Sequence, residues 1–221
     1  MKMKKCLLLI FITISVLFSN YSLAQTKKID ETQLMNIFNE SQDCLSKGQY
    51  EKAIELKTKV YNLCKGTDWE MLGGMCAADI AEIQLYALNN EKGYIDWLEK
   101  AESCGNKQAT GLLGDVYFQK GDYQKAKSYF EKSNEPRCIW FLATMYREQG
   151  GELGRNDEKY LYYMTKAADM GDPDAQFYLG LHYYSGRLVP IDKSKGISYL
   201  KKAAAQNHAP ALEVLQRENI K

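Results

Sequence analysis

A short pattern recurs in the second half of the chain and limits its fold more than any other feature. In each copy a small residue is followed four positions later by Leu, then by Gly or Ala, and three positions further by Tyr. The copies are Ala109-Leu113-Gly114-Tyr117, Cys138-Leu142-Ala143-Tyr146 and Ala175-Leu179-Gly180-Tyr183. Self-similarity at spacings of 29 and 37 residues predicts a solenoid of stacked helical hairpins and not a compact enzyme domain.

A second column of residues supports the same register. Aromatic residues are followed four positions later by small ones, which places each pair on one helix face. The pairs are Trp97 and Ala101, Tyr129 and Ser133, Tyr163 and Ala167, and Tyr199 and Ala203. Large and small side chains that alternate in this way predict closely interlocked helices. Gly114 and Gly180, in the first helices of their hairpins, would let the partner helix approach closely.

The residues between the columns predict where helices end and begin. Gly and Asn, which readily adopt the left-handed conformation that ends a helix, stand at Gly105, Asn134, Gly171 and Asn207. Carboxylates that can cap the second helices stand at Asp122, Asp157 and Asp192. The expected helices are 30–46, 50–65, 69–88, 91–104, 107–119, 122–133, 136–149, 157–170, 173–185, 192–206 and 209–219. We therefore predict an all-α solenoid of about five helical hairpins with a final capping helix.

These columns resemble a known family. The fullest copy reads Ala175, Leu179, Gly180, Tyr183, Gly186, Val189, Asp192, Lys195, Tyr199, Ala203 and Ala204. It is similar to the Sel-one-like repeat (SLR), a relative of the tetratricopeptide repeat (TPR). Residues 138–171 match less fully, 109–134 resemble a plain TPR, and 30–104 match only loosely. The resemblance implies a right-handed superhelix that serves as an adaptor or peptide-binding surface, in a family whose members are usually not enzymes.

The amino-terminal segment has the features of an export signal. Three lysines precede an apolar run over 6–18, and Ser22-Leu23-Ala24 places small residues where cleavage would occur. The run is shorter than the roughly 18 residues of a spanning helix, so an uncleaved anchor is the lesser alternative. We predict a signal peptide over 1–24, degenerate TPR-like hairpins over 25–104, SLR/TPR-like repeats with the cap over 105–221, and a periplasmic or secreted location.

Five cysteines remain after the predicted cleavage, and an odd number leaves at least one unpaired. Cys76 and Cys104 lie equally far from a turn centred near Asn90, so an antiparallel hairpin would place them opposite each other. They are the candidates for a disulfide bond. The alternative is that all five cysteines are small buried apolar residues.

Motifs for catalysis and metal binding are scarce in the sequence. The two histidines, His182 and His208, have no His or Cys at helical ligand spacing, so we expect no metal or other cofactor. Ser198 and Lys201 fit the S-x-x-K nucleophile pattern of penicillin-binding enzymes, but the companion S-D-N and K-T-G patterns are absent from the sequence. About one such match is expected by chance, and we interpret Ser198 as an ordinary helical residue.

Partner-binding residues should lie on the first helices at positions that the packing columns do not use. Six of them are of types enriched in interface hot spots, namely Phe118, Arg137, Trp140, Arg147, Phe177 and Tyr184. Arg137 and Arg147 are expected to be exposed, whereas the rings could instead pack between repeats. An aromatic row with flanking arginines would suit an extended peptide or a partner helix.

The charge balance narrows the class of partner. After cleavage the chain would carry 26 basic and 28 acidic residues, a balance that attracts neither nucleic acid nor an anionic membrane. We predict an exported, non-enzymatic scaffold that binds a protein or peptide, with no membrane insertion after cleavage. The alternatives are a cell-wall glycan-binding module and, less favoured, a penicillin-binding or β-lactamase-like hydrolase. The sequence specifies neither the partner nor the oligomeric state.

Overall fold

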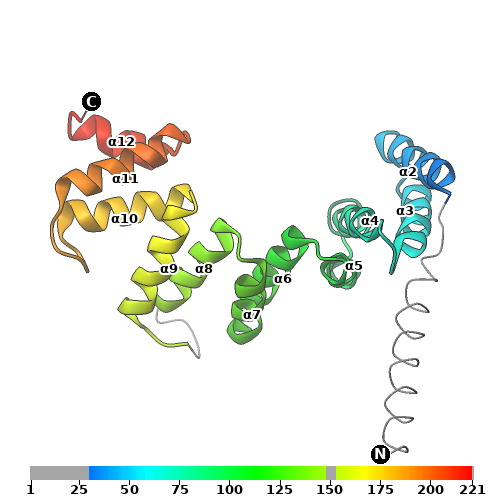
Figure 1. The fold of residues 1–221 in the computed structure, drawn as a ribbon, viewed down its shortest axis with the longest axis horizontal. Helices are drawn as coiled ribbons and strands as arrows, with labels where there is room; N and C mark the ends of the chain where they lie inside the picture. Colours follow the sequence, from blue (N-terminus) through cyan, green and yellow to red (C-terminus); the bar gives the residue numbers. More distant parts are fainter. Residues whose placement is uncertain (1–29, 148–152, 221) are drawn as a thin grey trace, which may run out of the picture. The chain divides into compact units, whose positions relative to one another are not determined.

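A computed structural model describes residues 30–147 and 153–220 of the chain (Figure 1). The predicted signal peptide and part of the glycine-rich loop at 150–154 lie outside these residues. All regular structure in the described residues is helical, as predicted. The contacts divide the chain into two compact units, residues 1–106 and residues 107–221, which are described separately.

Unit 1 contains two helical hairpins. Its helices are α2 (Glu31–Ser46), α3 (Tyr50–Cys64), α4 (Glu70–Glu82), the π-helix η1 (Ile83–Ala87) and α5 (Glu91–Ser103). The sequence predicted one continuous helix over 69–88, but its last turn widens into η1. The remaining boundaries in this unit fall within one or two residues of their predicted positions.

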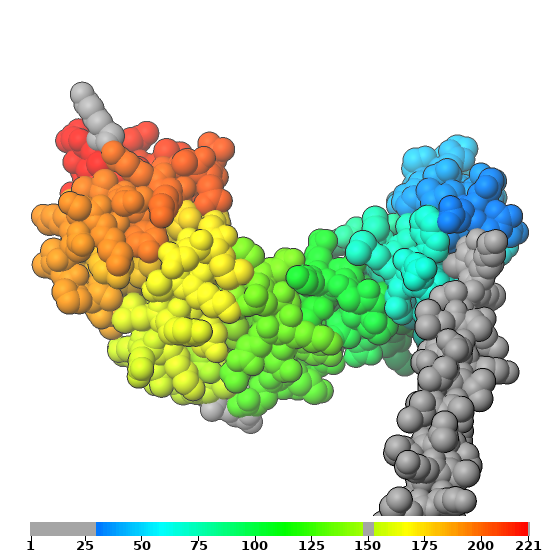
Figure 2. Space-filling model, in the orientation of Figure 1, coloured from blue at the N-terminus to red at the C-terminus, as the bar shows by residue number. Residues whose placement is uncertain are grey.

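Unit 2 contains three hairpins and a final helix. Its helices are α6 (Lys107–Gln119), α7 (Tyr123–Ser133), α8 (Pro136–Arg147), α9 (Asp157–Asp169), α10 (Pro173–Ser185), α11 (Lys193–Ala205) and α12 (Ala209–Arg217). In the space-filling view their side chains form a continuous packed surface from the green helices to the red ones (Figure 2). The predicted set of five hairpins and one capping helix is thus present in the described residues.

The two aromatic columns of the sequence meet inside the hairpins of unit 2. In each hairpin the Tyr of the first helix stacks on the Tyr of the second, with the ring planes within 7° of parallel. The stacked pairs are Tyr117 with Tyr129, Tyr146 with Tyr163, and Tyr183 with Tyr199. Parallel rings contribute dispersion and apolar burial, so one repeated contact fixes the register of every hairpin.

The glycines of the repeat allow the paired helices to approach closely, as the sequence predicted. A Cβ atom at Gly180 would lie 3.0 Å from the backbone oxygen of Gly196. A Cβ atom at Gly196 would lie 2.7 Å from the backbone nitrogen of Tyr184 and 2.8 Å from the oxygen of Gly180. The contact is therefore one of backbone against backbone, for which a side chain leaves no space.

The predicted helix ends are also confirmed. Gly105, Asn134, Gly171 and Asn207 all have positive φ angles, between 50° and 100°. Asp122 and Asp192 cap α7 and α11 by accepting hydrogen bonds from backbone N–H groups. The prediction for α9 was wrong by one residue, because its cap is Asn156, whose Oδ1 accepts from the nitrogen of Lys159 at 2.8 Å.

The cysteines of unit 1 are arranged differently from the predicted pairing. Cys76 and Cys104 are both free thiols in the structure. A Cβ atom at Gly74 would lie only 2.8 Å from the Cβ of Cys104, so Gly74 and not Cys76 is opposite Cys104. Cys76 is fully buried beside Cys64, and this burial raises the pKa of its thiol to about 12. The turn-symmetry argument placed Cys76 two residues out of register.

No helix within the described residues is long and apolar enough to cross a membrane.

Candidate functional site

A partly enclosed cavity in unit 2 brings together three of the six predicted partner-binding residues. Its volume is about 280 Å³. It is lined by Phe118 of α6, by Trp140, Phe141, Thr144 and Arg147 of α8, by Tyr160 and Met164 of α9, and by Tyr178 of α10. Four helices, α6, α8, α9 and α10, therefore contribute to one site, which we call the α8 cavity.

The helical repeat of α8 explains why its residues reach the cavity together. Trp140, Thr144 and Arg147 are spaced by four and three residues, so they lie along one face of the helix. Leu142 and Tyr146 are buried among the hairpin contacts on another face. The packing of the column residues thus orients α8, so that the face with Trp140, Thr144 and Arg147 lines the cavity.

The rings around the cavity hold one another in place. The Trp140 and Phe141 rings are 5.0 Å apart and meet edge to face, and the Phe141 ring stacks on Phe130 at 5.3 Å. Phe118 lies 6.0 Å from Phe141. Such aromatic contacts are each worth about 0.5–1.5 kcal/mol beyond apolar burial, so this wall is rigid.

Arg147 supplies the charge of the cavity. Its guanidinium lies 5.4 Å from the centroid of the Tyr160 ring and 5.9 Å from that of Tyr178, and it donates a hydrogen bond of 3.3 Å to the Tyr160 hydroxyl. The side chain is half-buried, whereas the sequence analysis expected it to be exposed. No carboxylate of residues 30–147 or 153–220 lies within ion-pair distance of it. The cavity therefore presents a positive charge that no carboxylate of the described residues contacts directly.

A buried hydrogen bond forms the base of the site. The Tyr160 hydroxyl lies 2.8 Å from Nε2 of His182, and both side chains are buried. Burial is the largest cause that lowers the pKa of His182, and the nearby charges of Arg147 and Arg187 add to it. Burial likewise raises the pKa of Tyr160. Both groups are consequently neutral near pH 7, which leaves Arg147 as the charged group of the base.

One polar atom of the wall lacks a partner. Nε1 of Trp140 is buried and has no hydrogen-bond acceptor among the described residues. The guanidinium of Arg137 covers the Trp140 ring at 4.1 Å from its centroid and pairs with Asp174 of α10. A buried donor without an acceptor costs about 1–3 kcal/mol, so this wall of the cavity carries an unfavourable contribution to stability.

Three of the predicted residues lie outside the cavity. Arg137 is exposed, as expected, and bridges α8 to α10 through Asp174. The Phe177 ring lies 4.9 Å from the ring of His208, which caps α12. The Tyr184 hydroxyl donates to a carboxylate oxygen of Glu218 at 3.0 Å. Phe177 and Tyr184 thus contact residues at the two ends of α12, and the structure does not place them in one row with Trp140.

Sequence reasoning missed the residues that the second helices contribute. Tyr160 and Met164 are fully buried residues of α9, and neither belongs to the columns. Tyr178 lies beside Leu179, one position from a column residue. Tyr160 lies three positions before the column residue Tyr163, so a search for aromatic residues within one helical turn of each column, in both helices of a hairpin, would have identified Tyr160 and Tyr178.

The described residues contain no group of three or more His, Cys, Asp or Glu side chains that could hold a metal ion. Ser198 lies exposed on α11 and does not line the α8 cavity. The lining of the α8 cavity supplies aromatic rings, hydrogen-bond donors and one cation.

Comparison with protein families identifies the repeats. Residues 136–172 and 173–208 match the Sel1 repeat, and residues 108–135 match the tetratricopeptide repeat. These matches cover α6 to α11 and include all four helices of the α8 cavity. The register that we deduced from the Leu and Tyr columns agrees with the family boundaries.

Solved structures show the same architecture. A Sel1 repeat protein from Oxalobacter formigenes aligns with a TM-score of 0.59 at 22% identity, over 76% of this chain and 49% of that one. A protective antigen of uropathogenic Escherichia coli strains, which displays an SLR fold, aligns with a TM-score of 0.61 at 21% identity, over 80% and 39% respectively. At these identities the likeness concerns the fold alone.

A curated relative is the alginate biosynthesis protein AlgK of Pseudomonas aeruginosa. It is 29% identical over 150 residues, an alignment that covers 62% of this chain and 30% of the relative. The chain thus spans about a third of that relative's length and less than half of either solved structure.

Proposed function

We propose that this Sel1-repeat protein is an exported, non-enzymatic scaffold that binds another protein through the α8 cavity. Helical-repeat solenoids generally act through extended binding surfaces and not through catalytic centres. The observation that carries the proposal is the convergence of Phe118, Trp140 and Arg147 on one cavity whose positive charge has no carboxylate partner among the described residues.

The chemistry of the cavity favours an acidic side chain beside an apolar one. The guanidinium of Arg147 can form paired hydrogen bonds with a carboxylate. Phe118 and Tyr178 offer apolar surface in the same cavity. The volume of about 280 Å³ is slightly below the range of about 300–1,000 Å³ that drug-sized ligands occupy, which favours one or two side chains of a peptide.

Export is supported by the amino-terminal sequence. Its basic start, apolar run and small residues before Gln25 are typical of a cleaved signal. The expected outcome of expression in a bacterial host is a periplasmic protein whose amino terminus, read by mass spectrometry, is Gln25. An intact Met1 in the cytoplasmic fraction would contradict this part of the proposal.

A peptide titration tests the binding site. The probe is a fluorescein-labelled Gly-Leu-Asp-Leu-Gly amide, compared with versions in which Asn or Arg replaces the Asp. We expect polarisation to rise for the acidic peptide only, and the Trp140→Ala/Arg147→Ala double variant to lose this binding while keeping its helical circular dichroism. Arg217→Ala, which removes an exposed arginine of the same unit, is the matched control and should bind as the wild type does. Unchanged binding by the folded double variant would refute the site.

A glycan-binding module is the second candidate, and the relative named for alginate biosynthesis is the observation that favours it. Alginate is an acidic polysaccharide, and a carboxylate-bearing sugar on the aromatic wall could pair with Arg147. Oligouronates added to the same titration separate the two candidates. If oligouronates displace the peptide and bind more tightly than every acidic peptide tested, the cavity is a glycan site. The protein-binding proposal expects acidic peptides to bind more tightly than oligouronates.

A further inference from the structure

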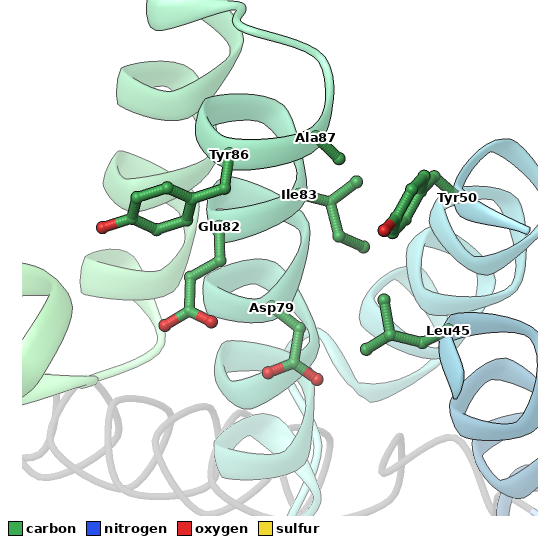
Figure 3. A pocket seen from close by; sticks show the side chains of 7 residues that line it. All are labelled: Leu45, Tyr50, Asp79, Glu82, Ile83, Tyr86 and Ala87. Carbon is green, nitrogen blue, oxygen red and sulfur yellow. The ribbon is translucent and has the colours of Figure 1, made fainter. Parts of the chain in front are cut away.

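Unit 1 contains a second cavity whose chemistry is opposite to that of the α8 cavity. It has a volume of about 260 Å³ and lies where the end of α2, the start of α3 and the α4–η1 segment meet. We call it the η1 cavity. Figure 3 shows that its lining has two parts. Leu45, Tyr50 and Ile83 face one another from three elements, while Asp79, Glu82 and Tyr86 project from the α4–η1 segment.

The π-helix that lines this cavity is held by specific contacts. The Asn90 backbone nitrogen donates to the Gln84 carbonyl oxygen at 2.7 Å, and the Asn90 side-chain nitrogen donates to the Gln84 side-chain oxygen at 2.8 Å. The Asn90 side-chain oxygen in turn caps α5 by accepting from the nitrogen of Gly93. A Cβ atom at Gly93 would lie 2.6 Å from the Asn90 side chain. The π-helical turn is therefore held by a hydrogen-bond network. Such turns inside α-helices frequently occur at functional sites.

The exposed ring of Tyr86 has no role in the packing of unit 1. Its side chain is 82% exposed, the highest exposure among the large hydrophobic residues of the described chain. Leu88, just beyond η1, and Tyr50, across the cavity, are also exposed. Apolar surface gathered in this way around a cavity is typical of an interaction site.

The charge of the cavity specifies what it can bind. Asp79 is held by Lys57, whose buried ammonium lies 2.6 Å from a carboxylate oxygen. Glu82 is exposed and makes no hydrogen bond or ion pair with any residue that the structure describes. Since Lys57 neutralises Asp79, the uncompensated charge is that of Glu82, which lies one helical turn from Tyr86. A cation is attracted both by this carboxylate and by the face of the aromatic ring.

We propose that the η1 cavity is a second docking site, which takes an arginine or lysine side chain of a protein partner with an adjacent apolar residue. The cationic head pairs with Glu82 and lies on the Tyr86 ring, and the apolar neighbour packs on Leu45, Tyr50 and Ile83. The volume suits side chains and is below the range of about 300–1,000 Å³ of small-molecule sites. Charge complementarity excludes the acidic segment that suits the α8 cavity.

The test uses defined peptides on the intact mature chain. The probes are fluorescein-labelled Gly-Leu-Arg-Leu-Gly amide and the same peptide with Glu or citrulline in place of Arg. The Arg peptide should bind with a Kd on the order of 0.1–1 mM that weakens as salt rises, and the other two should not bind. Glu82→Gln and Tyr86→Ala should each weaken binding roughly fivefold or more, and Glu82→Lys should abolish it.

Matched variants distinguish binding at the η1 cavity from binding at the α8 cavity and from non-specific attraction to exposed carboxylates. Glu99→Gln removes another exposed carboxylate of unit 1 and should leave the affinity unchanged. The Trp140→Ala/Arg147→Ala variant should bind the Arg peptide as the wild type does, so loss of one site is distinguishable from loss of the other. Equal affinity in Glu82→Lys and wild type, binding of the Glu peptide at this site, or no binding of the Arg peptide would each overturn the proposal.

Discussion

The α8 cavity and the η1 cavity are built on the same kind of helical hairpin but use their side chains differently. The α8 cavity is lined by rings that also pack the core, such as Phe141 against Phe130, and it is positively charged through Arg147. The η1 cavity is rimmed by Tyr86, which is almost fully exposed, and it is negatively charged through Glu82. Binding and stability are therefore coupled in unit 2 and separable in unit 1.

The difference also shows where individual function can arise in a repeat protein. Column residues such as Leu142 and Tyr146 are committed to hairpin packing and are buried. The residues that give the two cavities their character lie between the columns or in the irregular turn of η1. Substitutions in the two units should consequently lower stability by different amounts, and the predictions below run from the largest loss to the smallest.

The largest effect on stability is expected at the Lys57–Asp79 ion pair, whose carboxylate lies in the lining of the η1 cavity. Asp79→Ala leaves the fully buried Lys57 without its partner, which costs about 3–5 kcal/mol for buried pairs, and we expect the low end because Asp79 is 35% exposed. Lys57→Met is the matched control, since it replaces the cation with a hydrophobe of similar volume and should change stability little. Urea unfolding followed by circular dichroism measures both, and equal losses would contradict this account of the pair.

A smaller but clear loss is expected where two helices of unit 2 touch through their backbones. Gly196→Ala places a Cβ against Tyr184 and Gly180 backbone atoms, and overpacking of this kind costs about 1–3 kcal/mol. In unit 1, Gly73→Ala meets the Cβ of Cys64 at 3.1 Å, a contact that a small shift relieves, and it should cost less. Thermal unfolding of the two variants compares them directly, and a greater loss for Gly73→Ala would reverse the predicted order.

The base of the α8 cavity should make stability depend on pH. Because the folded pKa of His182 is lowered, the unfolded chain binds its proton more readily. The stability from neutral His182 is fully present above its unfolded pKa of about 6.5 and is lost as pH falls through the folded value. His182→Gln should remove this part of the slope below pH 6.5, and His208→Gln should retain it. Urea titrations at several pH values give the slopes, and an identical slope in His182→Gln would refute the assignment.

The smallest effect is expected at the rim of the η1 cavity. Tyr86→Ala should change the free energy of unfolding by less than about 0.5 kcal/mol, because the ring is 82% exposed. Trp140→Ala should cost about 1–3 kcal/mol, because its ring packs on Phe141 and Arg137. The two variants test whether residues of the η1 cavity can be changed without loss of stability while those of the α8 cavity cannot. Equal losses of unfolding free energy in Tyr86→Ala and Trp140→Ala would contradict this difference.

The sequence predicted the packing of the repeats better than it predicted the sites. The Leu, Gly and Tyr columns specified the hairpins because each column residue has one periodic role, and Gly and Asn at hairpin ends specified the caps. The π-helix at Ile83–Ala87 was missed because a hydrogen-bond network between Gln84 and Asn90, six residues apart, holds it, and such a network has no periodic signature in the sequence. A two-residue difference in register at this hairpin also separates Cys76 from Cys104.

The sequence grouped residues of one cavity where a single helix face was sufficient, and it missed residues whose place depends on contacts between helices. Phe118, Trp140 and Arg147 were selected because they lie off the columns of first helices. Tyr160 was missed because its position depends on a tertiary contact with His182 that sequence spacing does not encode. Phe177 and Tyr184 were grouped with Trp140 because their contacts with His208 and Glu218, which flank α12, have no signature in the sequence.

On the two proposals above, the α8 cavity and the η1 cavity carry opposite charges and recognise side chains of opposite charge. Amide chemical shifts of the isotope-labelled mature chain, titrated with the acidic and the basic peptides in turn, test it most directly. We expect the acidic peptide to shift resonances around Arg147 and Trp140, and the basic peptide to shift those around Glu82 and Tyr86. Both peptides perturbing the same residues, or neither perturbing either cavity, would contradict it.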